Sequence, residues 1–147
     1  MKNFLDLLDT KTEIVISIDL EPITHAGSPD IMLCVNRQEI YKGHLHHRWV
    51  NECRIDTRDA ICVELSMSNK IYRSDLETAV IIIRTLSCNG FDIVPELCHL
   101  ATYTNDHHYD SPTCYLGFNG TWRLDTQRPF YEWRHEITNQ GWLLYPS

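Results

Sequence analysis

Two histidines bracketed by two acids form the densest group of potential metal ligands or catalytic side chains in the sequence. The stretch YTNDHHYDSPT, at positions 103–113, places His107 and His108 between Asp106 and Asp110. A zinc or iron site needs imidazole and carboxylate groups that converge on one ion. Adjacent side chains on a strand point to opposite faces, and no HxxxH spacing is present. The stretch therefore predicts a polar loop tip rather than a metal centre.

A second histidine group lies in GHLHHRW, at positions 43–49. If residues 44–55 form a strand, His44 and His46 share one face and make half of a metal site. The sequence specifies no third ligand. The favoured interpretation is an exposed hairpin shoulder that follows Gly43.

Signatures of covalent catalysis are absent from the sequence. It contains no GxSxG elbow and no glycine-rich phosphate loop. A carboxylate pair such as Glu64 and Asp75 can be drawn anywhere in a chain with 20 acidic residues, so it does not indicate glycoside hydrolysis. The sequence predicts no enzyme, and a metal-dependent enzyme is the third of the functions considered.

The cysteines predict packing residues rather than a disulfide framework or a zinc site. No CxxC pair occurs, and nothing marks one thiol as activated. In a chain with no export signal, reduced thiols are expected. The six cysteines are Cys34, Cys53, Cys62, Cys88, Cys98 and Cys114.

The bulk composition indicates one globular domain over residues 1–147, with 43% hydrophobic and 22% charged residues. A net charge of −7 repels phosphate backbones, and Lys and Arg form no run, so nucleic acid is not an expected partner. Residues 1–12 read as an N-terminal extension whose apolar patch is broken by Asp6 and Asp9, unlike a signal peptide. No apolar run reaches the length of a membrane helix, so synthesis in the cytoplasm and no membrane partner are expected.

Alternating apolar residues predict an all-β fold of short antiparallel strands. In 13–20, Ile14, Ile16, Ile18 and Leu20 share one face, and Pro22 with the turn-rich HAGSPD is expected to end the strand. Turns are expected at Asn36 and at Asn89-Gly90, and residues 91–104 continue extended with an interruption at Pro95. Further strands are expected at 31–35, 47–55, 60–67, 78–87, 121–125 and 130–135. Strands at this spacing are typical of a single antiparallel β-sandwich.

The segment 74–86, SDLETAVIIIRTL, supports two predictions. Ser74 and Glu77 fit a capping box at the start of a helix. Val80 and three consecutive isoleucines favour a strand buried on both faces. We expect a polar loop to Glu77 and a strand from Thr78.

Residues 13–94 resemble a known family through PDIMLCVNRQEIYKG, an alternating strand and ELSMSNKIYRSDLETAVIIIRTLSCNGFD. The layout is similar to calcium-dependent, xylan-binding-type carbohydrate-binding modules, and it implies a jelly roll. The aromatic-rich part at 115–147, which includes YLGFNGTWRLDTQRPFYEWRHEITNQGWLLYP, resembles the C-terminal ends of small β-sandwich proteins of tailed bacteriophages. That second resemblance implies a virion setting.

Calcium is an alternative that the first resemblance raises. Asn69, Asp75 and Glu77 in one loop, together with Asp92, offer oxygen ligands beside the strand that matches the family. The loop also carries two cationic side chains, and the ligand run of the family is incomplete. We therefore expect no required cofactor, with calcium kept open.

Aromatic side chains are the candidates for binding a partner or a glycan, because exposed rings stack on sugars or dock proteins, whereas buried rings form a second core layer. If 130–135 is a strand, Phe130 and Glu132 face opposite Tyr131 and Trp133. Residues 129–145 are expected to pack some of their rings onto a neighbouring subunit. The candidates are Phe130, Trp133, Trp142, Trp122 and Tyr109.

The favoured function is a non-catalytic virion accessory protein of a tailed phage, such as a capsid decoration, neck or tail component. Its expected partners are other virion proteins, and a homo-oligomer is an open alternative. The second function considered is a glycan-binding module, with or without calcium, that recognises a surface glycan.

Overall fold

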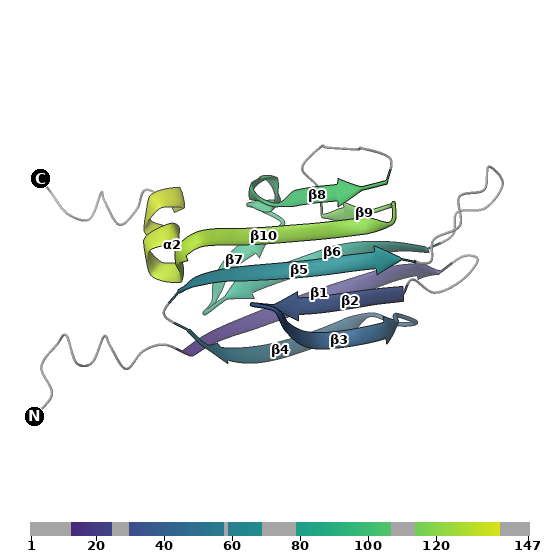
Figure 1. Ribbon diagram of the computed structural model, residues 1–147, viewed down its shortest axis with the longest axis horizontal. Coiled ribbons are helices and arrows are strands. Elements are labelled where there is room, and N and C mark those ends of the chain that lie inside the picture. The colour runs from purple at the N-terminus through teal and green to yellow at the C-terminus, as the bar shows by residue number, and fades with distance from the viewer. Residues whose placement is uncertain (1–12, 25–29, 58, 69–78, 107–113, 139–147) are drawn as a thin grey trace, which may run out of the picture.

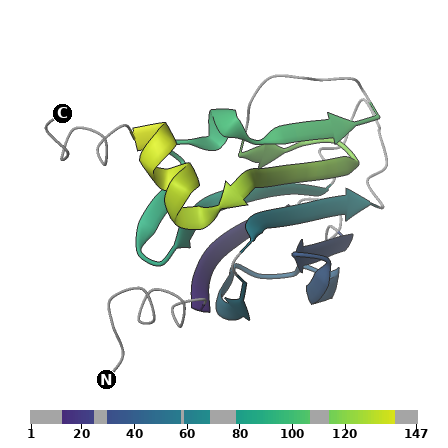
Figure 2. The ribbon, with the colours of Figure 1, turned by 60° about the vertical axis from the view of Figure 1, so that its left-hand side comes forward.

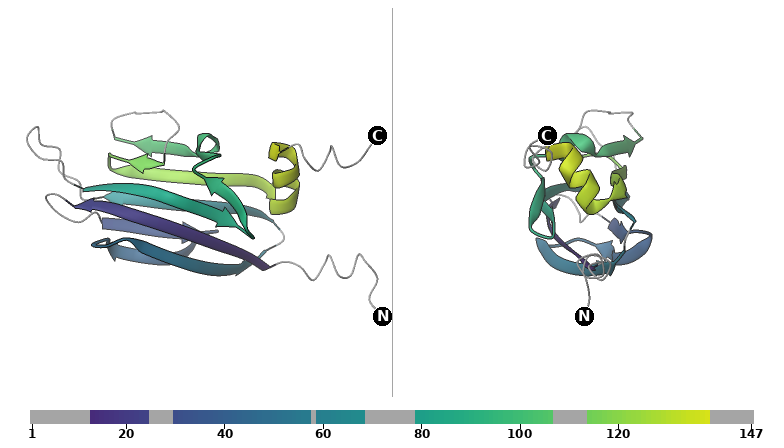
Figure 3. Two further views of the ribbon diagram at one scale, coloured as in Figure 1. Left: turned by 180° about the vertical axis from the view of Figure 1, so that it is seen from behind. Right: turned by 90° about the vertical axis from the view of Figure 1, so that its left-hand side faces the viewer.

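Two antiparallel sheets lie face to face, as the views in Figures 1 and 3 show. The computed structural model describes residues 13–24, 30–57, 59–68, 79–106 and 114–138. Sheet A has the order β4-β1-β6-β7, with β9 also paired to β6, and sheet B has the order β3-β2-β5-β10-β8. The predicted all-β sandwich is confirmed.

The strands and helices of the described residues carry the labels of Figure 1. Sheet A is built from β1 (Glu13–Thr24), β4 (Trp49–Asp56), β6 (Ala79–Cys88), β7 (Phe91–Val94) and β9 (Tyr115–Leu116). Sheet B is built from β2 (Asp30–Val35), β3 (Gln38–His44), β5 (Ala60–Ser68), β8 (Thr102–Asn105) and β10 (Gly120–Pro129). A 3-10 helix η1 (Cys98–Leu100) and an α-helix α2 (Phe130–Thr138) complete the described elements.

The core lies between the sheets and follows the alternation in the sequence. Because strand side chains point to opposite faces in turn, every second apolar residue enters the core. All four predicted inward residues of β1 are buried, as are Ile61, Val63, Leu65 and Met67 of β5. The predicted strand at 78–87 is also confirmed as β6, where Ile81 and Ile83 are fully buried.

β1 is longer than expected: Pro22 lies within it, contrary to the prediction, and it ends at Thr24, directly before the stretch HAGSPD. Its pairing with β4 runs only to Leu20, opposite Trp49, whereas its pairing with β6 continues to Thr24. Beyond Leu20 the strand is bonded on one side only. A proline, which lacks an N–H donor, is tolerated at such an edge position.

Both predicted tight turns are present. Asn36 and Arg37 join β2 to β3 with φ angles of 49° and 67°, and Asn89 and Gly90 join β6 to β7 with φ angles of 48° and 80°. Two consecutive residues with positive φ form the type I′ turn that matches the twist of a hairpin. Asparagine and glycine are the residues that adopt this conformation most readily.

Residues 91–104 are less extended than the sequence suggested. β7 ends at Val94, a cis peptide bond joins it to Pro95, and η1 intervenes before β8 begins at Thr102. The interruption at Pro95 was expected, but the short helix was not.

The predicted strand at 130–135 is wrong, because this segment forms the helix α2. Phe130, Trp133 and Ile137 recur at helical spacing and share the face that packs on the core. Phe130 and Trp133 contact Phe91 of β7, each with 6.2 Å between ring centroids. Since α2 follows β10 of sheet B and packs on sheet A, it covers one end of the sandwich (Figures 2 and 3).

The six cysteines are free, with Cys88 buried in the core and the others half-buried. This agrees with the prediction of reduced packing residues. Among the described residues, no helix is long and apolar enough to cross a membrane.

Candidate functional site

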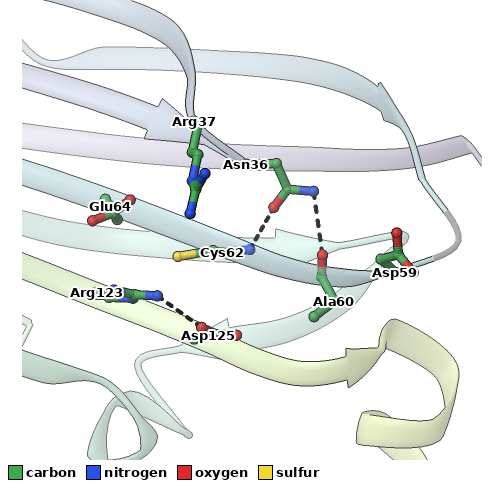
Figure 4. A pocket seen from close by; sticks show the side chains of 8 residues that line it. All are labelled: Asn36, Arg37, Asp59, Ala60, Cys62, Glu64, Arg123 and Asp125. Atoms are coloured by element: carbon green, nitrogen blue, oxygen red, sulfur yellow. Dashed lines mark hydrogen bonds and ion pairs between the residues drawn. The ribbon is translucent and has the colours of Figure 1, made fainter.

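A polar hollow of about 720 Å³ opens on the outer face of sheet B. It extends over the β2–β3 turn, the start of β5 and the second half of β10 (Figure 4). Inward residues of β5 such as Ile61 and Val63 fill the core, so the alternate residues Cys62 and Glu64 face outward into the hollow. The lining residues are Asn36, Arg37, Asp59, Ala60, Cys62, Glu64, Arg123 and Asp125.

Asn36 fixes the wall of the hollow that the β2–β3 turn forms. Its backbone N–H donates to the Cys62 carbonyl at 2.8 Å, and its Oδ1 accepts from the Cys62 N–H at 2.7 Å. Its Nδ2 donates to the Ala60 carbonyl at 3.3 Å. These bonds continue the β2–β5 ladder one residue beyond Val35, the last residue of β2. The turn is therefore tied to β5 rather than projecting freely into solvent.

A bulge in β10 fixes the opposite wall. The register jumps from Asp125, opposite Cys62, to Pro129, opposite Ala60, and Gln127 has a φ of 62°. Asp125 accepts a hydrogen bond from the Gln127 N–H at 2.8 Å through Oδ1. Its Oδ2 accepts from Arg123 Nη2 at 3.0 Å. Both carboxylate oxygens of Asp125 are thus held in place.

Thr126 supports the same wall from inside the core. Its hydroxyl accepts from the Ile61 N–H at 2.9 Å and donates to the Arg128 carbonyl at 2.7 Å. Only 3% of Thr126 is exposed. The hydroxyl therefore replaces the backbone bonds that the bulge removes from the β5–β10 ladder.

Three ionised side chains of the hollow have no ion pair among the residues that the structure describes: Arg37, Asp59 and Glu64. Glu64 lies opposite Arg123 in the β5–β10 register, but Arg123 pairs with Asp125 instead. By contrast, Arg48, Arg54, Arg84 and Arg128 each pair with a carboxylate. In Figure 4 the Arg37 side chain reaches from the turn toward β5. The hollow therefore offers uncommitted donors on one side and uncommitted acceptors in its middle.

Cys62 lies in the hollow as a thiol rather than a thiolate. Burial raises the pKa of Cys62 above its ordinary value, and the nearby Arg123 opposes this rise without reversing it. A protonated thiol is a weak nucleophile. Cys62 therefore has no mark of an activated nucleophile.

Asp19 on sheet A is 7% exposed. It is the one buried residue with an ionisable carboxyl group in the part of the chain that the structure describes. Arg48 holds it with two bonds, from Nε to Oδ1 at 2.9 Å and from Nη2 to Oδ2 at 2.5 Å. The hydrogen bonds from Arg48 lower the pKa of Asp19, and they outweigh the effect of burial. This pair ties the loop before β4 to the outer face of sheet A.

The predicted histidine and calcium candidates lie away from the hollow or outside the described residues. Asp106 is exposed after β8, and His107, His108 and Asp110 are outside the described residues. The rings of His44 and His46 are exposed with centroids 5.8 Å apart, which agrees with a hairpin shoulder. Over the described part of the chain, no group of three or more metal-ligating side chains is present.

For calcium, Asp92 is exposed on β7, and the other three candidates, Asn69, Asp75 and Glu77, fall outside the described residues. Calcium in proteins is bound by roughly six to eight oxygen atoms. The single exposed carboxylate of Asp92 does not supply that number. The calcium prediction therefore remains a prediction.

The expectation that the aromatic candidates form an exposed binding surface is wrong for three of them. Trp122 is fully buried, Phe130 is 2% exposed and Trp133 is 7% exposed. Trp122 lies on the inner face of β10. Phe130 and Trp133 lie on the face of α2 that packs on the core. Tyr109 and Trp142 are outside the described residues.

The residues of the hollow were not identified as a site from the sequence. They come from three separate segments, 36–37, 59–64 and 123–125, which are joined only by the order β2-β5-β10 in sheet B. The expected turn at Asn36 and the alternation of 60–67 place some of the side chains on the outer face. Nothing in the sequence pairs β5 with β10.

Two solved structures share this fold. The carbohydrate-binding module vCBM60 in complex with galactobiose aligns with a TM-score of 0.51 at 11% identity, over 75% of this chain and 96% of the module. The selenomethionine form of vCBM60, described with circular permutation between two families of calcium-dependent carbohydrate-binding modules, aligns with a TM-score of 0.52 at 12% identity. That alignment covers 76% of this chain and 89% of the module.

At these identities the likeness shows the fold alone. The resemblance to carbohydrate-binding modules is confirmed at the level of a β-sandwich, and the resemblance to phage proteins has no support from the comparisons. No protein-family model and no curated protein matches the chain.

Proposed function

We propose that this chain is a non-catalytic glycan-binding module. The observation that carries the proposal is the match of its two sheets to nearly the whole of vCBM60, a module that binds galactobiose. A fold can host unrelated functions, so a glycan-binding role also requires a site of suitable chemistry. The hollow on sheet B supplies carboxylate and guanidinium groups that complement sugar hydroxyls.

The virion role expected from the sequence is the weaker proposal. It came from the resemblance of residues 115–147 to phage proteins, together with the expectation that aromatic rings at 129–145 dock a neighbouring subunit. Phe130 and Trp133 are committed to the core, so they are not available as anchors on the folded chain. A location in the virion stays a prediction that copurification with particles would test.

Calcium dependence is a separate part of the proposal, suggested by the description of the vCBM60 families. The described residues do not assemble a calcium site, so no step of binding is assigned to the ion. Whether binding depends on calcium is tested by comparing titrations with calcium and with a chelator.

The direct test is binding of the purified full chain to a panel of oligosaccharides. Galactobiose, xylo-oligosaccharides and acidic oligosaccharides would be titrated by calorimetry, once with calcium and once with a chelator. We expect saturable binding to at least one glycan and no change in the reducing ends of the sugar on prolonged incubation. If the folded chain binds no glycan of the panel under either condition, the proposed function is wrong.

A further inference from the structure

We propose that the hollow on the outer face of sheet B is itself a glycan site, one that works without a metal ion and accepts a neutral sugar. This inference rests on the proposed function and adds the place, the mode and the substrate class of binding. The site is built from Arg37, Glu64, Arg123 and Asp125, with Asp59 at its rim.

Hydrogen bonds hold both walls of the hollow in place. Binding is weakened when loops and side chains must be ordered at the moment of association. Here the turn wall is tied to β5 through Asn36, and the bulge wall is tied through Thr126 and the two bonds to Asp125. The two walls of the hollow and the Asp125 carboxylate are therefore held in place before a ligand arrives.

The hollow also contains hydrogen-bonding groups that no ion pair occupies. Arg37 presents up to five N–H donors from the turn, and Glu64 presents two acceptor oxygens from β5. Adjacent hydroxyls of a sugar both donate and accept, so a ring that spans the hollow can use the carboxylate and the guanidinium together. The ion pair of Arg123 with Asp125 forms the far boundary of the same surface.

Charge decides between neutral and acidic sugars. The lining carries the carboxylates of Asp59, Glu64 and Asp125 against the guanidiniums of Arg37 and Arg123, in a chain of net charge −7. A uronic acid would meet an excess of negative charge, and like charges at short range oppose binding. A neutral hexose avoids this repulsion and keeps every hydrogen bond.

The absence of rings from the lining fixes the mode of binding. None of the eight lining residues is aromatic, so the flat face of a sugar has nothing to stack on. Recognition then depends on the hydroxyl edges. Because the ligand is uncharged, its affinity should change little with ionic strength.

The experiment titrates the full chain with galactobiose, and in parallel with its diuronic acid counterpart, in the presence of a chelator. The variants Arg37→Ala and Glu64→Gln remove the donors or the charge of the hollow. Arg54→Ala and Glu52→Gln are matched controls, since this exposed pair lies on β4 of the opposite sheet. Circular dichroism verifies that each variant is folded.

We expect galactobiose to bind without metal, the diuronic acid to bind more weakly, and each hollow variant to weaken binding by about tenfold or more, as for loss of a hydrogen bond to a charged group. The controls should match the wild type. If galactobiose fails to bind under chelation, if it binds equally to the hollow variants, or if the diuronic acid binds more tightly, the inference is overturned. The proposed function survives those results as long as some glycan binds when calcium is present.

Discussion

Replacing Thr126 with valine should destabilise the fold far more than the small change in side-chain volume suggests. Valine keeps the branched shape of the side chain and replaces the hydroxyl with a methyl group. That hydroxyl joins the Ile61 N–H to the Arg128 carbonyl at the bulge of β10. Ile61 is 1% exposed, so water cannot replace the lost partner of its N–H group.

The magnitude follows from these two bonds. A buried donor left without a partner costs about 1–3 kcal/mol, and the lost bond from the hydroxyl adds about 1 kcal/mol. Thr126→Val should therefore lower the free energy of unfolding by about 2–4 kcal/mol. The control Thr126→Ser keeps the hydroxyl and removes one methyl group, which is worth about 1 kcal/mol.

The assay is urea unfolding followed by circular dichroism and tryptophan fluorescence, with all three proteins compared at one pH. The expected order of stability is wild type, then Thr126→Ser, then Thr126→Val. If Thr126→Val is as stable as the wild type, or more stable than Thr126→Ser, the hydroxyl does not stabilise the bulge and the reasoning fails.

Three further predictions concern other parts of the sandwich. Gly120→Ala places a Cβ 2.2 Å from the Thr104 carbonyl oxygen, so we expect a loss of about 3 kcal/mol or failure to fold, measured by denaturation. Asp19, whose pKa is lowered in the folded state by Arg48, should stabilise the fold above its unfolded pKa of about 4 and lose this effect as the pH falls through the lower folded pKa. Stability measured against pH should show that acid loss in the wild type and not in Asp19→Asn. Trp133→Ala should cost about 3–5 kcal/mol in urea unfolding, because the ring is core rather than interface, and a loss of under about 1 kcal/mol would contradict its burial.

The sequence predicted the strands well where one physical rule acted alone. β1 and β5 alternate strictly, and a half-buried strand is the structure that hides such a pattern on one side. β6 required a choice between helix and strand, and its β-branched residues favoured the correct one. The rule is local, so the prediction needed no knowledge of strand partners.

The helix α2 was missed because its sequence satisfies two patterns. Phe130, Tyr131 and Trp133 fit an alternating strand, yet Phe130, Trp133 and Ile137 also fit one face of a helix. The choice between strand and helix depends on a tertiary contact, because the helix packs Trp133 against Phe91 of the other sheet at the end of the sandwich. The hollow was missed for a related reason, since its walls meet only after β5 and β10 pair.

The position of β10 also sets when the molecule can fold during synthesis. β10 lies between β5 and β8 inside sheet B, and its register pairs Gly120 with Met67 and Pro129 with Ala60. A nascent chain that has emerged only as far as β8 would leave both of those neighbours with an unpaired edge and the core without Trp122. Such long-range pairing makes folding slow compared with local hairpins. Sheet B therefore closes only after residue 129 has left the ribosome, and until then β5 and β8 present unpaired edges that can pair with other chains.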